Sequence, residues 1–204
     1  ASLDRWFASA GTTPILAAGS TDDSEDDRFV VAAFVPVRKT FDAKLMIAPR
    51  RPARVGEVLE LCAKHGLSVS LRSKMDREAD VYVLDTIGEL NYAYRFAQAA
   101  HVGGSLNGTG HNVIEPLEWG IPVSYGPIRG HFATMQESCE RAGVGTRTWS
   151  VSQLAVHWLG VLNSAESRQE IAEECTRMLK QHRGALEATL SEIRELIEER
   201  EAGR

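Results

Sequence analysis

The stretch from Gly103 to Pro116 has the composition best suited to chemistry, because two glycine-rich turns flank a histidine and lead to a glutamate. Glycine allows a backbone to approach a ligand closely. A helix that begins near Asn112 would point free N–H groups at the same place. Glu115, one turn later, could accept hydrogen bonds from a ribose diol. As alternatives, His111 could cap or pack a helix, and Glu115 could complement the helix dipole. Neither alternative explains the two flanking glycine-rich turns.

Two further segments offer groups that suit a phosphate. The turn Gly19-Ser20-Thr21 supplies two hydroxyls and free N–H groups ahead of a helix. Taken alone, these residues favour an ordinary Ser/Thr N-cap. The turn Pro49-Arg50-Arg51-Pro52 supplies guanidinium groups, which bind phosphate or carboxylate well. Paired arginines at loop tips are, however, more often solvated surface residues.

A fourth segment, Asp85-Thr86-Ile87-Gly88-Glu89-Leu90, admits two interpretations. Thr86 and Glu89 have the spacing of a capping box, in which each side chain satisfies a backbone N–H at the start of a helix. In the functional interpretation, free N–H groups around Ile87 and Gly88 line a ligand crevice. The two interpretations are compatible with each other.

The elements that carry these segments alternate between β-rich runs and helical patterns. We expect strands at 14–18, 44–48, 68–71, 81–84, 100–102, 121–125 and 144–149. Helices are expected at 22–37, 52–62, 88–97, 112–119, 132–142, 151–162 and 166–200, the last bent or broken at Gly184. This alternation predicts an α/β fold, a parallel sheet with helices on both faces. Ligands in such sheets bind beyond the carboxyl ends of the strands, and each of the four segments follows a predicted strand.

The bulk properties are those of one soluble α/β domain. The 204 residues are 43% hydrophobic and 25% charged. The net charge of −5 gives no electrostatic footprint for nucleic acid. The three cysteines share no metal-ligand spacing and fit reduced thiols in the cytoplasm. We find no apolar run long enough for a membrane helix and no signal-peptide pattern at the start, and we expect no metal site.

The four segments, in this order and spacing, resemble the transferases of Kdo (3-deoxy-D-manno-octulosonic acid), which attach Kdo to lipid A precursors. The resemblance runs from about Pro14 to Trp149. The family pattern has Gly-Ser-Thr, Pro-Arg-His, Gly-Asp-Thr-Met-Gly-Glu-Leu and Gly-Gly-Ser-Leu…Gly-Gly-His-Asn…Leu-Glu-Pro. This sequence departs from it in one shortened loop and at four positions, Arg51, Leu84, Ile87 and Thr109. A divergent member that uses another CMP-linked acid is therefore an open alternative.

The resemblance implies the C-terminal half of a GT-B glycosyltransferase of lipopolysaccharide biosynthesis. Residues 1–165 would form a Rossmann-like domain that binds the donor CMP-Kdo, and residues 166–204 would form C-terminal helices that pack on it or toward an N-terminal domain. The implied donor contacts are Ser20, Thr21, Pro49, Arg50, Ile87, Gly88, Glu89, His111, Asn112, Val113, Ile114 and Glu115. No cofactor or metal is implied.

The same resemblance places the general base, the lipid A precursor site and the membrane contact in the N-terminal domain, which precedes this chain. The whole enzyme would then work at the cytoplasmic face of the bacterial inner membrane. We expect this chain to be soluble, to bind nucleotide, to hold no catalytic residue and to transfer no sugar by itself. The alternatives are the donor domain of a UDP-sugar GT-B transferase, a UDP-GlcNAc epimerase, or a non-catalytic domain of the same fold.

Overall fold

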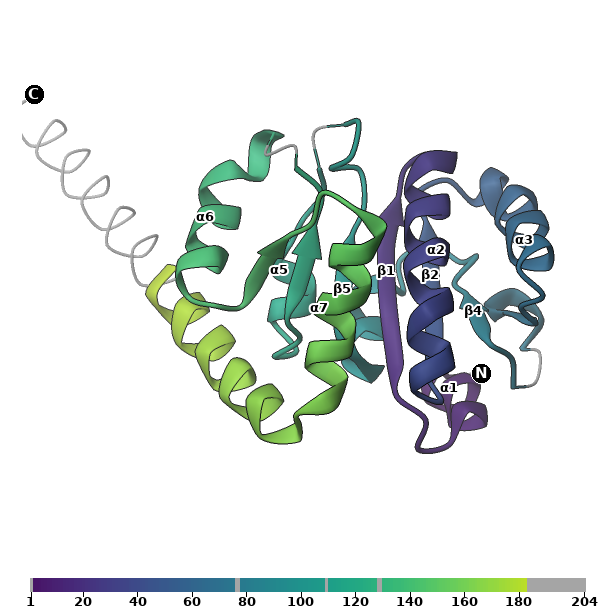
Figure 1. The fold of residues 1–204 in the computed structure, drawn as a ribbon, viewed down its shortest axis with the longest axis horizontal. Helices are drawn as coiled ribbons and strands as arrows, with labels where there is room; N and C mark the ends of the chain where they lie inside the picture. Colours follow the sequence, from purple (N-terminus) through teal and green to yellow (C-terminus); the bar gives the residue numbers. More distant parts are fainter. Residues whose placement is uncertain (1, 76–77, 109, 128–129, 183–204) are drawn as a thin grey trace, which may run out of the picture.

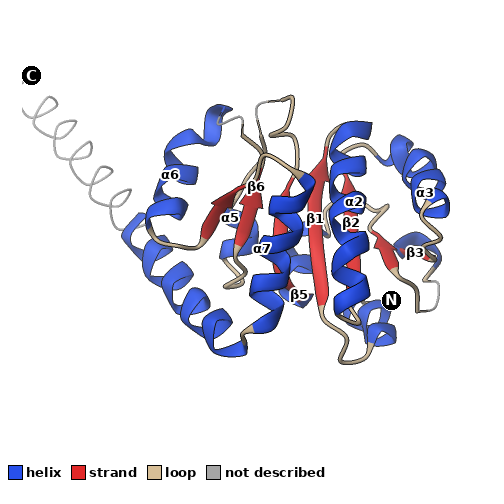
Figure 2. Ribbon diagram, in the orientation of Figure 1, coloured by secondary structure: helices blue, strands red, loops and turns tan. Residues whose placement is uncertain are grey.

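Seven parallel strands form a single sheet in the order β3-β4-β2-β1-β5-β6-β7. This computed structural model describes residues 2–75, 78–108, 110–127 and 130–182, shown as a ribbon in Figures 1 and 2. The strands are β1 (Ile15–Thr21), β2 (Lys44–Pro49), β3 (Val69–Leu71), β4 (Val81–Val83), β5 (Ala97–Val102), β6 (Val123–Tyr125) and β7 (Gly145–Arg147).

One face of the sheet is covered by three helices, α2 (Ser24–Thr40), α3 (Val55–Lys64) and α7 (Val151–Asn163). Figure 1 shows α2 and α7 side by side in front of β1 and β5. Leu16 and Ala18 of β1 point into this core, and Ile15 and Ala17 point into the core on the opposite face. Because parallel strands are buried on both faces, β1 is an apolar run and not an alternating one.

The other face carries the shorter helices α1 (Leu3–Phe7), α4 (Leu90–Ala93), α5 (Ile114–Leu117) and α6 (Ala133–Arg141). Single turns of 3-10 helix lie at Ala8–Ala10, Pro52–Arg54, Arg72–Lys74, Tyr94–Phe96 and Gly130–Phe132. Residues 165–182 are helical and pack Cys175 and Met178 into the core around β6. Residues 183–204, which include the predicted bend at Gly184, lie outside the described residues.

The predicted α/β fold is confirmed, and two of the predicted helices are shorter than expected. A helix from Asn112 would need the nitrogen of Pro116 to donate to the Asn112 carbonyl, and proline has no N–H. The helix therefore begins two residues later, at Ile114. The helix expected at 88–97 shortens to α4 and one 3-10 turn, because β5 already begins at Ala97.

The strand order places a topological switch point beside β1. From β1 the chain adds β2 on one side, and it later returns to add β5 on the other side and then β6. The connections that leave β1 and β5 therefore separate above the carboxyl edge of the sheet. Open α/β sheets bind ligands in the crevice that forms at this point.

Candidate functional site

The carboxyl ends of β1, β2 and β4 enclose a small hollow. It has a volume of about 150 Å³. Its lining comes from three of the four segments identified in the sequence and consists of Ser20, Ala48, Pro49, Arg50, Pro52, Leu84, Thr86, Ile87, Gly88 and Leu90. The fold therefore brings these three segments, which are far apart in sequence, to one place.

The end of β1 has an unusual backbone. Ser20 adopts a φ of 56°, in the left-handed region, where the strand register shifts between Gly19 and Thr21. The turn after β5 packs directly against this backbone, because a Cβ on Gly103 would lie only 2.7 Å from the Ser20 carbonyl oxygen. Strained residues of this kind are concentrated at functional sites. The side chain of Ser20 lines the hollow, whereas Thr21 is fully buried and its side chain does not reach it.

Three arginines near the hollow differ in what they bind. Arg51 donates to the Asp22 carbonyl at 2.6 Å and lies 3.3 Å from the Asp22 carboxylate. Arg54 is buried and forms an ion pair with Asp27. Arg50 is exposed, and within the described part of the chain its guanidinium has no hydrogen bond or ion pair. Arg50 is therefore the cation that remains available to an anionic ligand.

The segment after β4 does not form the capping box that its spacing suggested. Helix α4 begins at Leu90, and Glu89 is its N-cap without a capping hydrogen bond from its side chain. The Glu89 carboxylate instead accepts from Arg72 at 2.7 Å and from the Thr86 hydroxyl. Burial raises the pKa of Glu89, but these bonds outweigh it and hold that pKa below its usual value. Ile87 remains 87% exposed at the mouth of the hollow.

In the fourth segment, the second glycine of the Gly-Gly turn contacts the histidine. Gly104 has a φ of 75°, and a Cβ there would lie 2.7 Å from His111 Nε2. The amide of Gly110 donates to the Gly104 carbonyl at 2.9 Å and closes this loop. Burial, and then the charge of Arg50, lowers the pKa of His111. The imidazole is therefore neutral at pH 7, and Thr109 within this loop lies outside the described residues.

The helix after this loop holds Glu115 in a half-buried position. Asn112 Oδ1 accepts from the Ile114 amide at 3.0 Å, so that amide is not free for a ligand as the sequence suggested. Asn112 Nδ2 donates to Glu115 Oε1 at 3.4 Å. Burial is the main cause that raises the pKa of Glu115, and Arg50 is close enough to oppose it. Val113 is fully buried in the core, so only its backbone can meet a ligand.

Sequence reasoning missed the role of the acidic run that opens α2. Carboxylates in a first helical turn complement the helix dipole, but Asp26 and Asp27 are also buried, with exposures of 2% and 1%. Asp26 accepts from the Gly104 amide at 2.7 Å. Of these contacts, only the N-cap could be inferred from the sequence: the Asp23 carboxylate accepts from the amides of Glu25 and Asp26.

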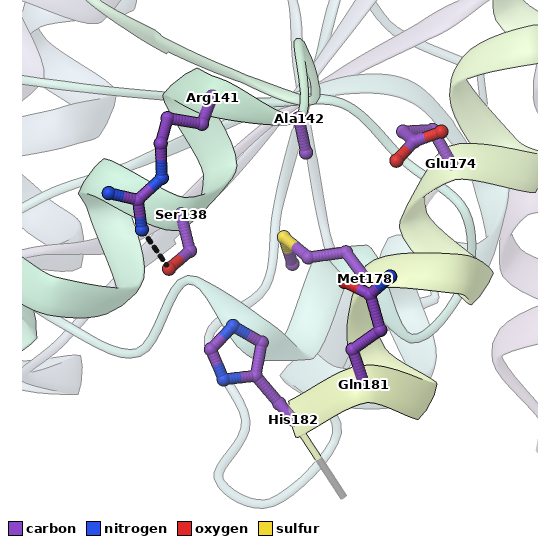
Figure 3. A pocket seen from close by; sticks show the side chains of 7 residues that line it. All are labelled: Ser138, Arg141, Ala142, Glu174, Met178, Gln181 and His182. Carbon is purple, nitrogen blue, oxygen red and sulfur yellow. Dashed lines mark hydrogen bonds between the residues drawn. The ribbon is translucent and has the colours of Figure 1, made fainter. Parts of the chain in front are cut away.

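A larger hollow, of about 460 Å³, lies away from the four segments, between α6 and the helix at 165–182. Figure 3 shows its lining residues, Ser138, Arg141, Ala142, Glu174, Met178, Gln181 and His182. None of these residues belongs to the predicted site.

The described residues contain no group of three or more histidine, cysteine or acidic side chains arranged to hold a metal. Among the same residues, no helix is both long enough and apolar enough to span a bilayer.

The two curated relatives described below share one name. It is 30% identical over 190 residues to the 3-deoxy-D-manno-octulosonic acid transferase of Haemophilus influenzae, covering 91% of this chain and 44% of that protein. It is 30% identical over 201 residues to the transferase of the same name from Bordetella pertussis, covering 94% of this chain and 46% of that protein. The chain thus spans about half the length of the curated relatives it matches.

A solved structure of a related domain has a similar fold. The C-terminal CMP-Kdo binding domain of WaaA from Acinetobacter baumannii matches with a TM-score of 0.77 and 24% identity, over 87% of this chain and 99% of that one. No protein-family model matches the chain. By sequence the chain is a homologue of the 3-deoxy-D-manno-octulosonic acid transferases, and by structure it has the fold of the C-terminal, Rossmann-like domain of a GT-B glycosyltransferase.

Proposed function

We propose that this chain binds CMP-Kdo at the carboxyl edge of its sheet, as the donor-binding part of a Kdo transferase. The observation that carries the proposal is the convergence of three of the four segments on the hollow at Arg50, a cation with no hydrogen bond or ion pair within the described residues. Beside the larger effect of burial, His111 and Glu115 of the fourth segment lie close enough to Arg50 for its charge to act to lower the pKa of both. The relatives are Kdo transferases by name, which supports Kdo as the sugar that the whole protein transfers.

In this proposal the phosphate of the donor lies beside Arg50. The side chains of Ser20 and Ile87 and the backbone of Gly88 line the same hollow. The ribose diol binds Glu115, whose carboxylate Asn112 orients. His111 closes the site as a neutral group. Pro49, Glu89 and Val113 contribute through their backbone or by packing, and Ile114, whose amide is bonded to Asn112, contributes by packing.

The proposed reaction is displacement at the anomeric carbon of Kdo by a hydroxyl of a lipid A precursor. The bond from that carbon to the phosphate oxygen breaks, and CMP leaves as a monophosphate anion. Arg50 stabilises the charge that develops on the leaving group, and such fixed electrostatic stabilisation is commonly a large part of catalysis. We assign no general base to the described residues.

Acceptor binding, the general base and membrane contact then belong to a part of the protein other than this chain. The whole enzyme would work at the cytoplasmic face of the bacterial inner membrane. The chain by itself therefore binds CMP but does not transfer Kdo. Transfer of Kdo to a lipid A precursor by the isolated chain would contradict this part of the proposal.

Calorimetric titration of the chain with CMP, and in parallel with UMP and UDP, tests the donor assignment. We expect CMP to bind more tightly than UMP or UDP, and Glu115→Ala to weaken the binding. A preference for UDP would instead assign the chain to the UDP-sugar enzymes. A wild-type chain that binds none of the three would remove the support for a preformed donor site.

A further inference from the structure

Asp26 is a buried carboxylate next to the candidate site but outside its lining. It lies in the first turn of α2 and is 2% exposed. Burial raises its pKa, and hydrogen bonds from the amides of Asp22 and Gly104 oppose that rise. A buried carboxylate is costly unless hydrogen bonds compensate it, so its presence here calls for a structural reason.

The two bonds to Asp26 join two different connections of the sheet. Its Oδ2 atom accepts from the Asp22 amide at 2.8 Å, in the turn that follows β1. The same oxygen accepts from the Gly104 amide at 2.7 Å, in the turn that follows β5. These are the two connections that separate at the topological switch point. One carboxylate oxygen therefore joins the two turns, beyond the last backbone bond between them, in which the Gly103 amide donates to the Gly19 carbonyl at 2.9 Å.

The Gly104 turn transmits this constraint to the ligand-facing residues. His111 packs against Gly104, and Gly110 donates to the Gly104 carbonyl. On the opposite side, the Asp22 backbone carbonyl is held by Arg51, which follows Arg50 in the chain. A shift of the Gly104 turn would move His111 relative to Arg50.

We propose that Asp26 is a positioning residue for donor binding, which holds the Gly104 turn and thereby sets the placement of His111 against Arg50. This inference rests on the proposed function for its ligand, CMP. The link between Asp26 and Gly104 itself does not depend on any ligand and can be measured without one.

The test compares three variants by CMP titration, thermal unfolding and amide hydrogen exchange at Gly104. Asp26→Ala removes the acceptor and leaves the Gly104 N–H buried without a partner, so the Kd for CMP should rise about tenfold or more. Asp26→Asn keeps one oxygen that can accept both bonds, and its Kd should fall between those of wild type and Asp26→Ala. Exchange at the Gly104 amide should be fastest in Asp26→Ala.

The matched control is Asp27→Ala, because Asp27 is equally buried in the same turn but pairs with Arg54 and not with the Gly104 turn. It should lower the unfolding temperature while the Kd for CMP changes less than about threefold. Equal effects of Asp26→Ala and Asp27→Ala on CMP binding would overturn the positioning role, as would an Asp26→Asn variant that binds no better than Asp26→Ala.

The ligand-free measurement separates this inference from the proposed function. If the wild-type chain binds no CMP, the proposed function fails, and the donor-binding role of Asp26 fails with it. If CMP binds but exchange at Gly104 is the same in wild type and Asp26→Ala, the proposed function stands and the inference about Asp26 is overturned.

Discussion

Removal of the Arg50 side chain should weaken CMP binding far more than removal of the adjacent Arg51. Arg50 lines the hollow and has no partner within the described residues, so it can give its charged N–H groups to a phosphate. Hydrogen bonds to charged groups contribute about 1.5–3 kcal/mol. Because Arg50 is exposed, solvent screens the interaction and favours the lower end of that range. Since about 1.4 kcal/mol corresponds to tenfold in Kd, we expect Arg50→Ala to raise the Kd for CMP about tenfold.

Arg51 provides the matched control because it differs from its neighbour mainly in its partners. Its guanidinium is already bonded to the Asp22 carbonyl and lies beside the Asp22 carboxylate. Arg51→Ala should therefore change the Kd less than about threefold, since exposed ion pairs contribute little. Both variants should unfold within a few degrees of wild type, as most surface substitutions do.

Calorimetric titration at two salt concentrations measures this difference. The wild-type affinity should fall as salt increases, and the dependence should be shallower in Arg50→Ala because one contact between charges is gone. A larger loss of affinity in Arg51→Ala than in Arg50→Ala would refute the assignment of the phosphate to Arg50. So would an Arg50→Ala variant with unchanged affinity and unchanged salt dependence.

Two further predictions concern the fourth segment. The pKa of Glu115 is raised, and only its ionised form accepts hydrogen bonds from both ribose hydroxyls, so CMP affinity should be highest above that pKa and should fall as the pH drops through it. In titrations at a series of pH values, Glu115→Gln should lose this dependence. A pH profile of Glu115→Gln identical to that of wild type would contradict the role of Glu115. Gly104→Ala places a Cβ 2.7 Å from the His111 ring, at a residue whose φ is 75°. A non-glycine residue in this left-handed conformation costs roughly 1–2 kcal/mol, so with the added clash Gly104→Ala should lower the free energy of unfolding by more than that amount. It should also weaken CMP binding. Gly143→Ala has a similar φ of 72° with nothing within 4 Å, and in thermal unfolding it should show the conformational cost alone; equal costs for the two variants would refute the predicted clash.

The sheet could be predicted from the sequence because its strands are short apolar runs bounded by turn residues. Every predicted strand overlaps an observed one. Helix α1 was not predicted, although Leu3, Trp6 and Phe7 have helical spacing after an N-cap at Ser2. Such a short run is weak by itself, and it is stabilised by tertiary packing, including the bond from Trp6 Nε1 to Ser70 at 2.9 Å. Packing between distant segments cannot be inferred from local sequence patterns.

The candidate site could be predicted in its location but not in its internal hydrogen bonds. Its four segments were found because glycines and charged residues follow the strands. The partners of Glu89 and Asp26, which are Arg72 and Gly104, are set by how distant turns meet. For the same reason, the sequence could not show that Arg51 is paired with Asp22 while Arg50 has no hydrogen bond or ion pair among the described residues.

The measurement that most directly tests the account is a titration of the ¹⁵N-labelled chain with CMP, followed by amide chemical shifts. If CMP binds at the carboxyl edge of the sheet, the amides with the largest shifts lie in the turns that hold Ser20, Arg50, Gly88 and Glu115. Saturating shifts confined to the hollow between α6 and the helix at 165–182, with the carboxyl edge of the sheet unchanged, would contradict it.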